Sequence, residues 1–480
     1  MARSSEYPSG STGLTSSQGL TMSDSNQVTD DAVVVIPGIM GSELRDTSTD
    51  KLIWGFSPRT LARLWTAGES AFDLLRVQDD QPGTVRPGGL LRTTTAAPVL
   101  GGYEPYTRLV DELQAIVLRP DAVAEFAYDW RMSTRYNGKL LAAAIDRHIR
   151  KWREAVDRPQ ARVHLVAHSM GGLLCRELTT ISGALDDVAS IITVGTPFGG
   201  SPKAAQVLNS GRGLPIPLPA KRLRAVAVTM AGLHDLLPTY RCVDDGDYIR
   251  RLTSSDVADL GGNLNLAEQT FDRAHMLRDT VLPHHHPVIG KAQKTVCSLR
   301  LDAGVVTGLH HSFHPASDTD VIRDPKTGAP LPFSGDGDGT VPHNAAQPNG
   351  SAKILELPQQ HGPIAQSPQT IAAITAIILG RTPHFGIKLG PDDLGIDAPD
   401  LATAGIAFDT EITGAQSPVG LRMTLTDTET NTDVGRPVAH RREGRLLITV
   451  TAPEPSIFRL TVRRGADAVS QLIIVTPHGA

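Results

Sequence analysis

The fold of this chain is decided by the stretch Val163-His164-Leu165-Val166-Ala167-His168-Ser169-Met170-Gly171-Gly172-Leu173-Leu174-Cys175-Arg176. An apolar run leads into a serine between small residues, and a helix-like pattern follows. This order describes a nucleophile elbow, a sharp strand-to-helix turn that exposes one serine hydroxyl at the top of a sheet. The turn needs small residues two positions before and after the serine, and Ala167 and Gly171 supply them, although glycine is usual at the first position. We therefore predict that Ser169 lies at such a turn.

Strands and helices alternate on both sides of this turn. Short apolar runs predict buried strands over 32–36, 191–194 and 353–357, the first ending at Pro37-Gly38. Apolar residues at helical spacing predict helices over 137–156 and near 367–379. Alternation of this kind indicates an α/β protein with a mostly parallel sheet and helices on both faces.

The pattern divides the chain into three parts. Residues 1–30 are rich in Ser, Thr and Gly and are expected to form a disordered tail, and residues 31–382 are expected to form the catalytic domain. Irregular stretches predict cap or lid insertions at about 43–102 and 201–333, because they are too long for plain connections in a compact sheet. Alternating apolar and polar residues from 385 to 480 predict a small β-sandwich, interpreted as immunoglobulin-like.

Composition excludes several classes of protein. The chain has 480 residues, 40% of them hydrophobic, which is enough for a large core and a further module. A formal charge of -5 without a polybasic stripe argues against nucleic acid as a partner. The 3 cysteines are far apart, which argues against a disulfide framework and a cysteine metal cluster. No signal peptide or membrane-spanning run is recognised, so a cytoplasmic protein is expected, with peripheral membrane contact left open.

A serine at such a turn needs two partners. A serine hydroxyl is a weak nucleophile, and it requires a histidine to accept its proton and a carboxylate to orient that histidine. With this elbow the order along the chain is serine, acid, histidine. The acidic turn 335–342 and then His361 follow in that order, and Asp338 is preferred as the acid, with Asp336 in reserve.

Metal sites are the competing interpretation of these segments. The Asp-Gly-Asp-Gly run resembles a calcium loop, but its sixth position is Val341 and its twelfth is Gln347. The histidines at 284–286 and at 310, 311 and 314 motivate a metal hydrolase, yet adjacent histidines cannot all point at one ion and no acidic helix motif accompanies them. We expect no metal site and no cofactor.

The chemistry also requires an oxyanion hole. Two backbone amides usually stabilise the negative charge of the tetrahedral intermediate. The amide of Met170, directly after the serine, is the first candidate. The amide of Ile39, in the turn after the first strand, is the second, because glycines on either side allow close approach.

Several of these segments together resemble the lecithin:cholesterol acyltransferase family of α/β-hydrolases. The likeness covers roughly residues 32–380 and lies in the segments 37–42, 128–131, 168–172, 196–201, 236–240 and 337–342. The resemblance implies an α/β-hydrolase fold with Ser169 as nucleophile, Asp338 as acid and His361 as base. It also implies cleavage of acyl esters of lipids through an acyl-enzyme and transfer of the acyl group to water or an alcohol.

The resemblance has limits. The secreted relatives carry signal peptides and often a disulfide near a lid, and neither is recognised here, so sterol acylation is not implied. Segment 128–131 is interpreted as architectural, with an ion pair from its Asp or Arg, and segment 196–201 as part of the site rim.

Two features remain open at this point. Trp54, Phe56 and Trp65 are large apolar groups in a chain with 4% aromatic residues, so we predict that they bind substrate by lining an acyl pocket or touching lipid, with ordinary packing as the alternative. The C-terminal sandwich is expected to recruit a protein partner or simply to stabilise the fold. A catalytically inactive hydrolase fold recruited through that sandwich is the alternative function.

Overall fold

A computed structural model describes most of the chain. The described ranges are 28–55, 73–78, 81–91, 106–212, 220–317, 319–350, 352–383, 394–399, 401–428, 430, 432–465 and 467–476.

A parallel sheet forms the centre of the protein. Its strand order is β17-β10-β7-β6-β1-β5, and each neighbouring pair is parallel. The bounds in chain order are β1 Ala32–Ile36, β5 Val123–Glu125, β6 Val163–His168, β7 Val188–Val194, β10 His285–Gly290 and β17 Leu355–Leu357. All residues of β1 and β6 are buried, as expected for strands covered on both faces. The predicted α/β class is confirmed.

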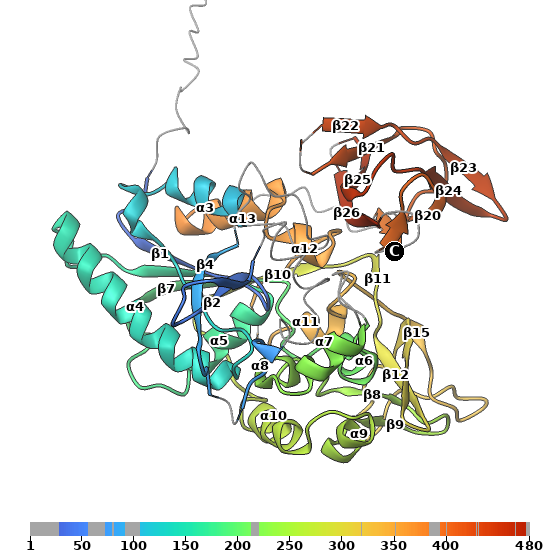
Figure 1. The fold of residues 1–480 in the computed structure, drawn as a ribbon, viewed down its shortest axis with the longest axis horizontal. Coiled ribbons are helices and arrows are strands. Elements are labelled where there is room, and N and C mark those ends of the chain that lie inside the picture. The colour runs from blue at the N-terminus through green and yellow to red at the C-terminus, as the bar shows by residue number, and fades with distance from the viewer. Residues whose placement is uncertain are drawn as a thin grey trace, which may run out of the picture.

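Helices cover both faces of this sheet (Figure 1). On one face, α4 (Thr134–Val156) packs on α5 (Met170–Leu178), and on the other, α3 (Thr107–Gln114) lies beside α13 (Pro368–Ile378). Helix α4 begins three residues earlier than predicted, because the Ser133 hydroxyl caps it by accepting from the Tyr136 amide. Helix α13 begins at Pro368, directly after Ser367, which caps it by accepting from the Thr370 amide.

Two strands of the central sheet, β5 and β10, are not predicted from the sequence pattern. Strand β5 is short and follows a 3₁₀ turn, η1 (Pro120–Ala122). Strand β10 has the sequence HHPVIG, and its histidines and proline conceal the apolar pattern. Because β10 lies between β7 and β17, the segment 201–333 is not one continuous cap, contrary to the prediction.

The remaining elements of the first 382 residues form two excursions. The first is a three-stranded sheet of order β3-β2-β4, with β2 Ser42–Asp46, β3 Leu52–Trp54 and β4 Val85–Leu90. The second carries α6 Pro202–Ser210, α7 Ala220–Ala227, α8 Ala231–His234, β8 Arg241–Asp244, β9 Ile249–Arg251, α9 Ser254–Asp259 and α10 Leu264–Met276 before β10. After β10 come β11 Gln293–Lys294, β12 Ser298–Asp302, β13 Val305–Leu309, β14 His311–Ser312, β15 Phe333–Ser334, β16 Asp336–Gly337, α11 His343–Ala346 and, beyond β17, α12 His361–Ile364.

The C-terminal region, defined here as the described residues 394–476, consists of strands. One sheet has the order β18-β20-β24-β23 and the other β19-β26-β25-β21-β22, with mainly antiparallel pairs. The bounds are β18 Gly395–Asp397, β19 Leu401–Thr403, β20 Phe408–Thr413, β21 Leu421–Asp427, β22 Thr432–Gly435, β23 Ala439–Arg442, β24 Arg445–Val450, β25 Ser456–Arg464 and β26 Asp467–Thr476. A separate apolar cluster, including Ile448, Phe458 and Leu460, forms its core. The β-rich character is confirmed, and an immunoglobulin-like topology stays a prediction.

Among the described residues, no helix is both long enough and apolar enough to cross a membrane.

Candidate active site

Ser169 occupies a strained turn between β6 and α5. Its backbone has φ 54° and ψ -124°, a conformation that residues with a side chain rarely adopt. The Ser169 amide donates to the Val194 carbonyl (2.8 Å), and the Ser169 carbonyl accepts from the Gly172 amide (3.0 Å). The predicted strand-to-helix turn is therefore present, and neighbouring backbone holds it in this conformation.

Glycines let the surrounding segments approach this turn. A Cβ atom at Gly38 would lie 2.9 Å from the Ser169 Cβ, and one at Gly172 would lie 2.1 Å from the Thr196 Oγ1. Real Cβ atoms do not tolerate such distances, so side chains at these positions would push the loops after β1 and β7 away from the serine.

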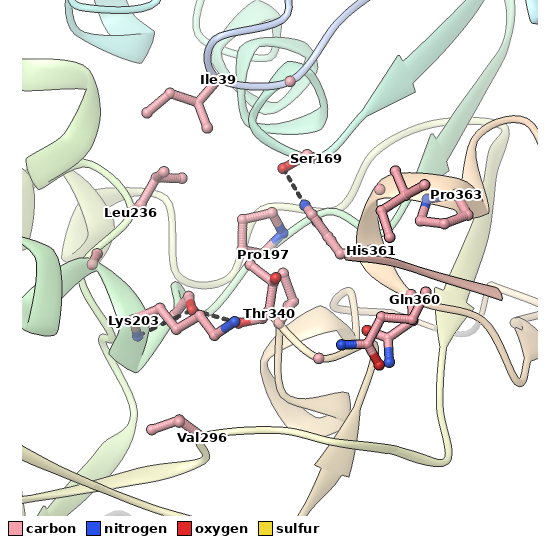
Figure 2. Close-up of a pocket in the computed structure, with 18 of the residues that line it drawn as sticks. Ile39, Ser169, Pro197, Lys203, Leu236, Val296, Thr340, Gln360, His361 and Pro363 are labelled. Carbon is pink, nitrogen blue, oxygen red and sulfur yellow. Dashed lines mark hydrogen bonds between the residues drawn. The ribbon is translucent and has the colours of Figure 1, made fainter. Parts of the chain in front are cut away.

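Ser169, His361 and Asp338 form a hydrogen-bonded chain. The Ser169 Oγ lies 2.8 Å from the His361 Nε2 (Figure 2), and the His361 Nδ1 lies 2.7 Å from the Asp338 Oδ2. The His361 amide also donates to the Asp338 carbonyl (2.8 Å), which joins the two loops through their backbones. These distances allow the imidazole to accept a proton from the serine while the carboxylate orients it.

The surroundings of Asp338 distinguish it from Asp336. The Asp338 side chain is 1% exposed, and its Oδ1 accepts from the amides of Thr340 (3.0 Å) and Val341 (2.7 Å). Asp336 is exposed, and its Oδ2 accepts from the Ala292 amide (3.1 Å). The structure brings Asp338 to His361 and leaves Asp336 outside the chain of hydrogen bonds.

A second histidine joins the loops around the serine. The Tyr106 hydroxyl accepts from the Gly38 amide (2.9 Å) and lies 2.8 Å from the His168 Nδ1, while the His168 Nε2 lies 3.0 Å from the His361 carbonyl. We assign a neutral His168 whose Nε2–H donates to that carbonyl, because the tyrosine proton then points at Nδ1 and every group is satisfied. Burial lowers the pKa of His168 to about 3, which agrees with this assignment.

This bridge connects the turn after β1 to the loop that carries His361. No sequence pattern points to Tyr106, which lies 62 residues from His168 in the chain.

The turn after β1, which carries Ile39, lies close to the serine. The Gly41 amide donates to the Gly38 carbonyl (3.1 Å), and Met40 takes the left-handed conformation (φ 64°). Ile39 and Ser169 both line the same cavity. Met170 begins α5, so its amide is one of those that a helix leaves without an intrahelical acceptor. The assignment of the Ile39 and Met170 amides to the oxyanion hole stays a prediction.

Trp54 supports this turn and does not line the cavity at Ser169, and its role in substrate binding stays a prediction. Its Nε1 donates to the Met40 carbonyl (3.0 Å), and its ring packs edge-on against Trp130 with the ring centres 5.3 Å apart. It borders a separate apolar cavity of about 20 Å³. The other two predicted substrate-binding residues, Phe56 and Trp65, lie outside the described residues.

The segment 128–131 has the architectural role that its pattern indicates. The Tyr128 hydroxyl donates to the Pro37 carbonyl (3.0 Å), at the base of the turn after β1. Arg131 and Asp129 form a buried two-point ion pair, with Nε–Oδ1 and Nη2–Oδ2 distances of 2.9 and 2.6 Å. Arg131 also donates to the carbonyls of Leu74 and Pro82, so the pair attaches the first excursion to the sheet.

The segment 196–201 joins the rim of the site to the Asp338 turn. The Ser201 hydroxyl donates to the Thr340 carbonyl (2.6 Å), and the Gly199 amide donates to the Ala345 carbonyl (2.7 Å). Pro197 and Ser201 line the cavity, in agreement with the predicted rim role (Figure 2).

The cavity at Ser169 has a volume of about 320 Å³. Its apolar wall comes from the turn after β1 and from α6, α8 and the segment before β12, and includes Ile39, Ala204, Val207, Leu233, Leu236 and Val296. The remaining wall includes Gln360 and residues of the C-terminal region. The alternating strand pattern of that region does not predict its position beside the serine.

The histidine-rich segments serve other contacts. His285 lies within β10, where its Nε2 is 2.8 Å from the Thr193 Oγ1, and burial lowers its pKa to about 4. The His310 Nδ1 donates to the Thr295 carbonyl (2.9 Å). Within the described ranges, no group of three or more His, Cys, Asp or Glu side chains is arranged to hold a metal ion. The 3 cysteines, Cys175, Cys242 and Cys297, are buried free thiols.

Comparisons with known proteins agree with this fold. Residues 74–288 match the sequence family described as lecithin:cholesterol acyltransferase. An uncharacterised protein of Saccharomyces cerevisiae is 30% identical over 171 residues, which cover 34% of this chain and 23% of that protein. The present chain thus spans about a quarter of the length of this curated relative.

Two solved structures resemble this chain at low sequence identity. A chain of the Tle4-Tli4 complex is 15% identical with a TM-score of 0.52, and the match covers 75% of this chain and 100% of that chain. The mature Bacillus licheniformis lipase BlEst2 is 12% identical with a TM-score of 0.33, and the match covers 74% of this chain and 94% of that chain. The first likeness supports the α/β-hydrolase fold, and the second is too distant to carry an argument. Residues 74–288 are therefore similar to the lecithin:cholesterol acyltransferase family, within a chain of α/β-hydrolase fold.

Proposed function

We propose that this protein is a serine-dependent acyl hydrolase or O-acyltransferase that acts on lipid-like esters. The observation that carries the proposal is the chain of hydrogen bonds from Ser169 through His361 to the buried Asp338. The family match over residues 74–288 supports lipid esters as the class of substrate.

The first step is attack by the Ser169 Oγ on the carbonyl carbon of the ester. The His361 Nε2 accepts the serine proton as the new C–O bond forms, and Asp338 stabilises the resulting imidazolium. The carbonyl oxygen becomes an oxyanion, and the amides of Ile39 and Met170 donate to it.

The second step expels the alcohol. The C–O bond to the alcohol breaks, His361 returns its proton to the departing oxygen, and the acyl group stays on Ser169. Water or a second alcohol then gives its proton to His361 and attacks the acyl carbon. The bond from this carbon to the Ser169 Oγ breaks, His361 returns the proton to that oxygen, and an acid or a new ester leaves.

A fluorophosphonate probe tests the nucleophile without assuming a substrate. We expect intact-mass analysis to show one adduct on the wild type and none on Ser169→Ala. The matched control is Ser210→Ala, which removes an exposed hydroxyl on α6 and should label like the wild type. Labelling of Ser169→Ala equal to that of the wild type would refute Ser169 as the nucleophile.

Ester turnover separates an active enzyme from an inactive fold. We expect the wild type to hydrolyse medium-chain esters and His361→Ala to lose this activity. A wild type that neither labels nor turns over esters would favour the alternative, a recruitment role through the C-terminal region.

A further inference from the structure

The C-terminal region forms one wall of the cavity at Ser169. Ile396, Asp397 and Ala398, from β18 and the residue after it, line the cavity together with Gln471 and Leu472 of β26. Ile396 and Leu472 are 2% and 7% exposed, and Ile396 belongs to the apolar core of the C-terminal region. The wall is therefore part of the packed structure.

Side-chain amides hold this junction together. The Gln293 side chain accepts from the Ile396 amide and donates to the Leu394 carbonyl, both at 3.2 Å. The amide side chain of Gln293 thus pairs with one backbone donor and one backbone acceptor at β18, as the backbone of a neighbouring strand would. Gln293 is fully buried, and its own backbone pairs with Gly337, directly before Asp338. One residue thus connects β18 to the turn that carries the acid.

The residue before His361 contacts the same strand. The Gln360 Nε2 donates to the Gln293 Oε1 (3.0 Å) and to the Ile396 carbonyl (3.2 Å). A further contact runs from the Gln359 Nε2 to the Ala468 carbonyl (2.6 Å) in β26. The loop that positions His361 is therefore hydrogen-bonded to the C-terminal region.

Backbone packing and an ion pair complete the junction. A Cβ atom at Gly395 would lie 2.4 Å from the Ala292 carbonyl oxygen, so β18 approaches the catalytic domain as closely as glycine allows. At the partly exposed edge, the Lys294 Nζ lies 2.8 Å from the Asp397 Oδ2.

The two ends of the cavity differ in chemistry. Figure 2 shows Ile39, Leu236 and Val296 on one side of the Ser169–His361 pair and Gln360 on the other. The apolar side continues toward the separate small cavity, which shares Ile39, Val207 and Leu233 with it. The apolar side of the cavity suits the hydrocarbon chain of an acyl group.

The reaction fixes where the alcohol must lie. His361 returns its proton to the departing alcohol oxygen, so that oxygen has to come within hydrogen-bond distance of the His361 Nε2. The alcohol then extends along the His361 side of the cavity, which is bounded by Gln360, β18 and β26.

We propose that the C-terminal region forms the binding site for the alcohol part of the ester and so selects the alcohol that leaves or accepts the acyl group. This inference rests on the proposed ester chemistry at Ser169. It assigns substrate selection to a region in which the sequence shows only alternating strands.

The test changes the size of a wall residue and measures alcohol selectivity. Ala398→Phe fills part of the proposed site, and Asp397→Trp does so at the partly exposed edge, where folding is less sensitive to size. The substrates are methyl octanoate and 1-naphthyl octanoate, and each variant is compared with the wild type by its ratio of kcat/KM values. We expect the naphthyl-to-methyl ratio to fall about tenfold or more, as is usual for steric discrimination in a pocket.

The control is Val438→Phe, which adds the same ring to a residue of the C-terminal region that is 76% exposed and outside the cavity. Its ratio should equal that of the wild type. In the wall variants, the preference among methyl esters of different acyl length should also stay unchanged, because the acyl chain lies on the other side.

The outcomes are distinguishable. An unchanged naphthyl-to-methyl ratio in folded Ala398→Phe and Asp397→Trp would overturn the inference while leaving the serine chemistry intact. If Ala398→Phe fails to fold, Asp397→Trp decides. Absence of both labelling and turnover in the wild type would overturn the proposed function, and the inference with it.

Discussion

Asp338→Asn is the sharpest test of the chemistry at Ser169, because the structure dictates which way the new amide must face. The Asp338 Oδ1 accepts from the amides of Thr340 and Val341, and only an oxygen can take that place. The NH2 group of the asparagine then replaces Oδ2 and faces the His361 Nδ1 at about the present 2.7 Å. As a donor, it forces Nδ1 to accept, so the imidazole proton moves to Nε2.

A proton on Nε2 prevents His361 from accepting the serine proton. In serine proteases, the same exchange of a triad aspartate for asparagine lowers kcat by about 10⁴-fold, and about 5.5 kcal/mol of transition-state stabilisation corresponds to that factor. We expect a loss of about 10³ to 10⁴-fold in kcat, with KM changed little, because the carboxylate lies behind the histidine and away from the cavity.

The assay is steady-state hydrolysis of a medium-chain ester at pH 7.5, with thermal unfolding measured in parallel. Asparagine keeps the acceptor for both buried amides, so the fold should survive, whereas alanine would leave them unsatisfied at a cost of about 1–3 kcal/mol each. Asp336→Asn is the control and should stay within about twofold of the wild type, because that carboxylate is exposed. Retention of activity within tenfold in folded Asp338→Asn would refute the assignment of the acid.

Three further predictions concern the surroundings of the triad. Tyr106→Phe removes the hydroxyl between the Gly38 amide and His168, and we expect the free energy of unfolding in urea to fall by about 1–3 kcal/mol, with reduced kcat; an unchanged midpoint would contradict the bridge. Gly172→Ala places a methyl group against Thr196, so its thermal midpoint should fall, whereas Gly89→Ala, with no described atom within 4 Å of the new methyl group, should be neutral. Burial lowers the pKa of His168 to about 3 and that of His285 to about 4, below the ordinary 6.5, so the unfolded chain binds more protons than the folded protein between those values and 6.5. Stability measured by urea unfolding should therefore fall as the pH drops from 6.5 toward 4, by up to about 1.4 kcal/mol per pH unit for each histidine, and His285→Asn should reduce this slope.

Much of the site is visible in the sequence because its parts are local. The elbow is a contiguous stretch in which an apolar run, a serine and two glycines specify strand, turn and helix without reference to the rest of the chain. The order of serine, acid and histidine along the chain then restricts the partners, and the structure brings the preferred Asp338 and His361 to Ser169.

Local sequence patterns are least informative where a residue's role depends on distant contacts. Trp54 stands out in the sequence as a large apolar side chain, but only the fold shows that its indole contacts Met40 and Trp130 and supports the turn after β1. Strand β10 is hidden because His285, His286 and Pro287 interrupt the apolar pattern, although neighbouring strands enclose it.

The sequence by itself determined the α/β class, the nucleophile turn, the order of the triad candidates and the β-rich character of the C-terminal region. Each of these follows from spacing within one element, where side chains two to four positions apart share a face or a turn. Only the tertiary structure decided that Tyr106 and His168 join the loops around the serine and that Gln293 attaches the C-terminal region to the site. These contacts join residues 62 and 103 positions apart, and their formation depends on how whole elements pack, which no local pattern encodes.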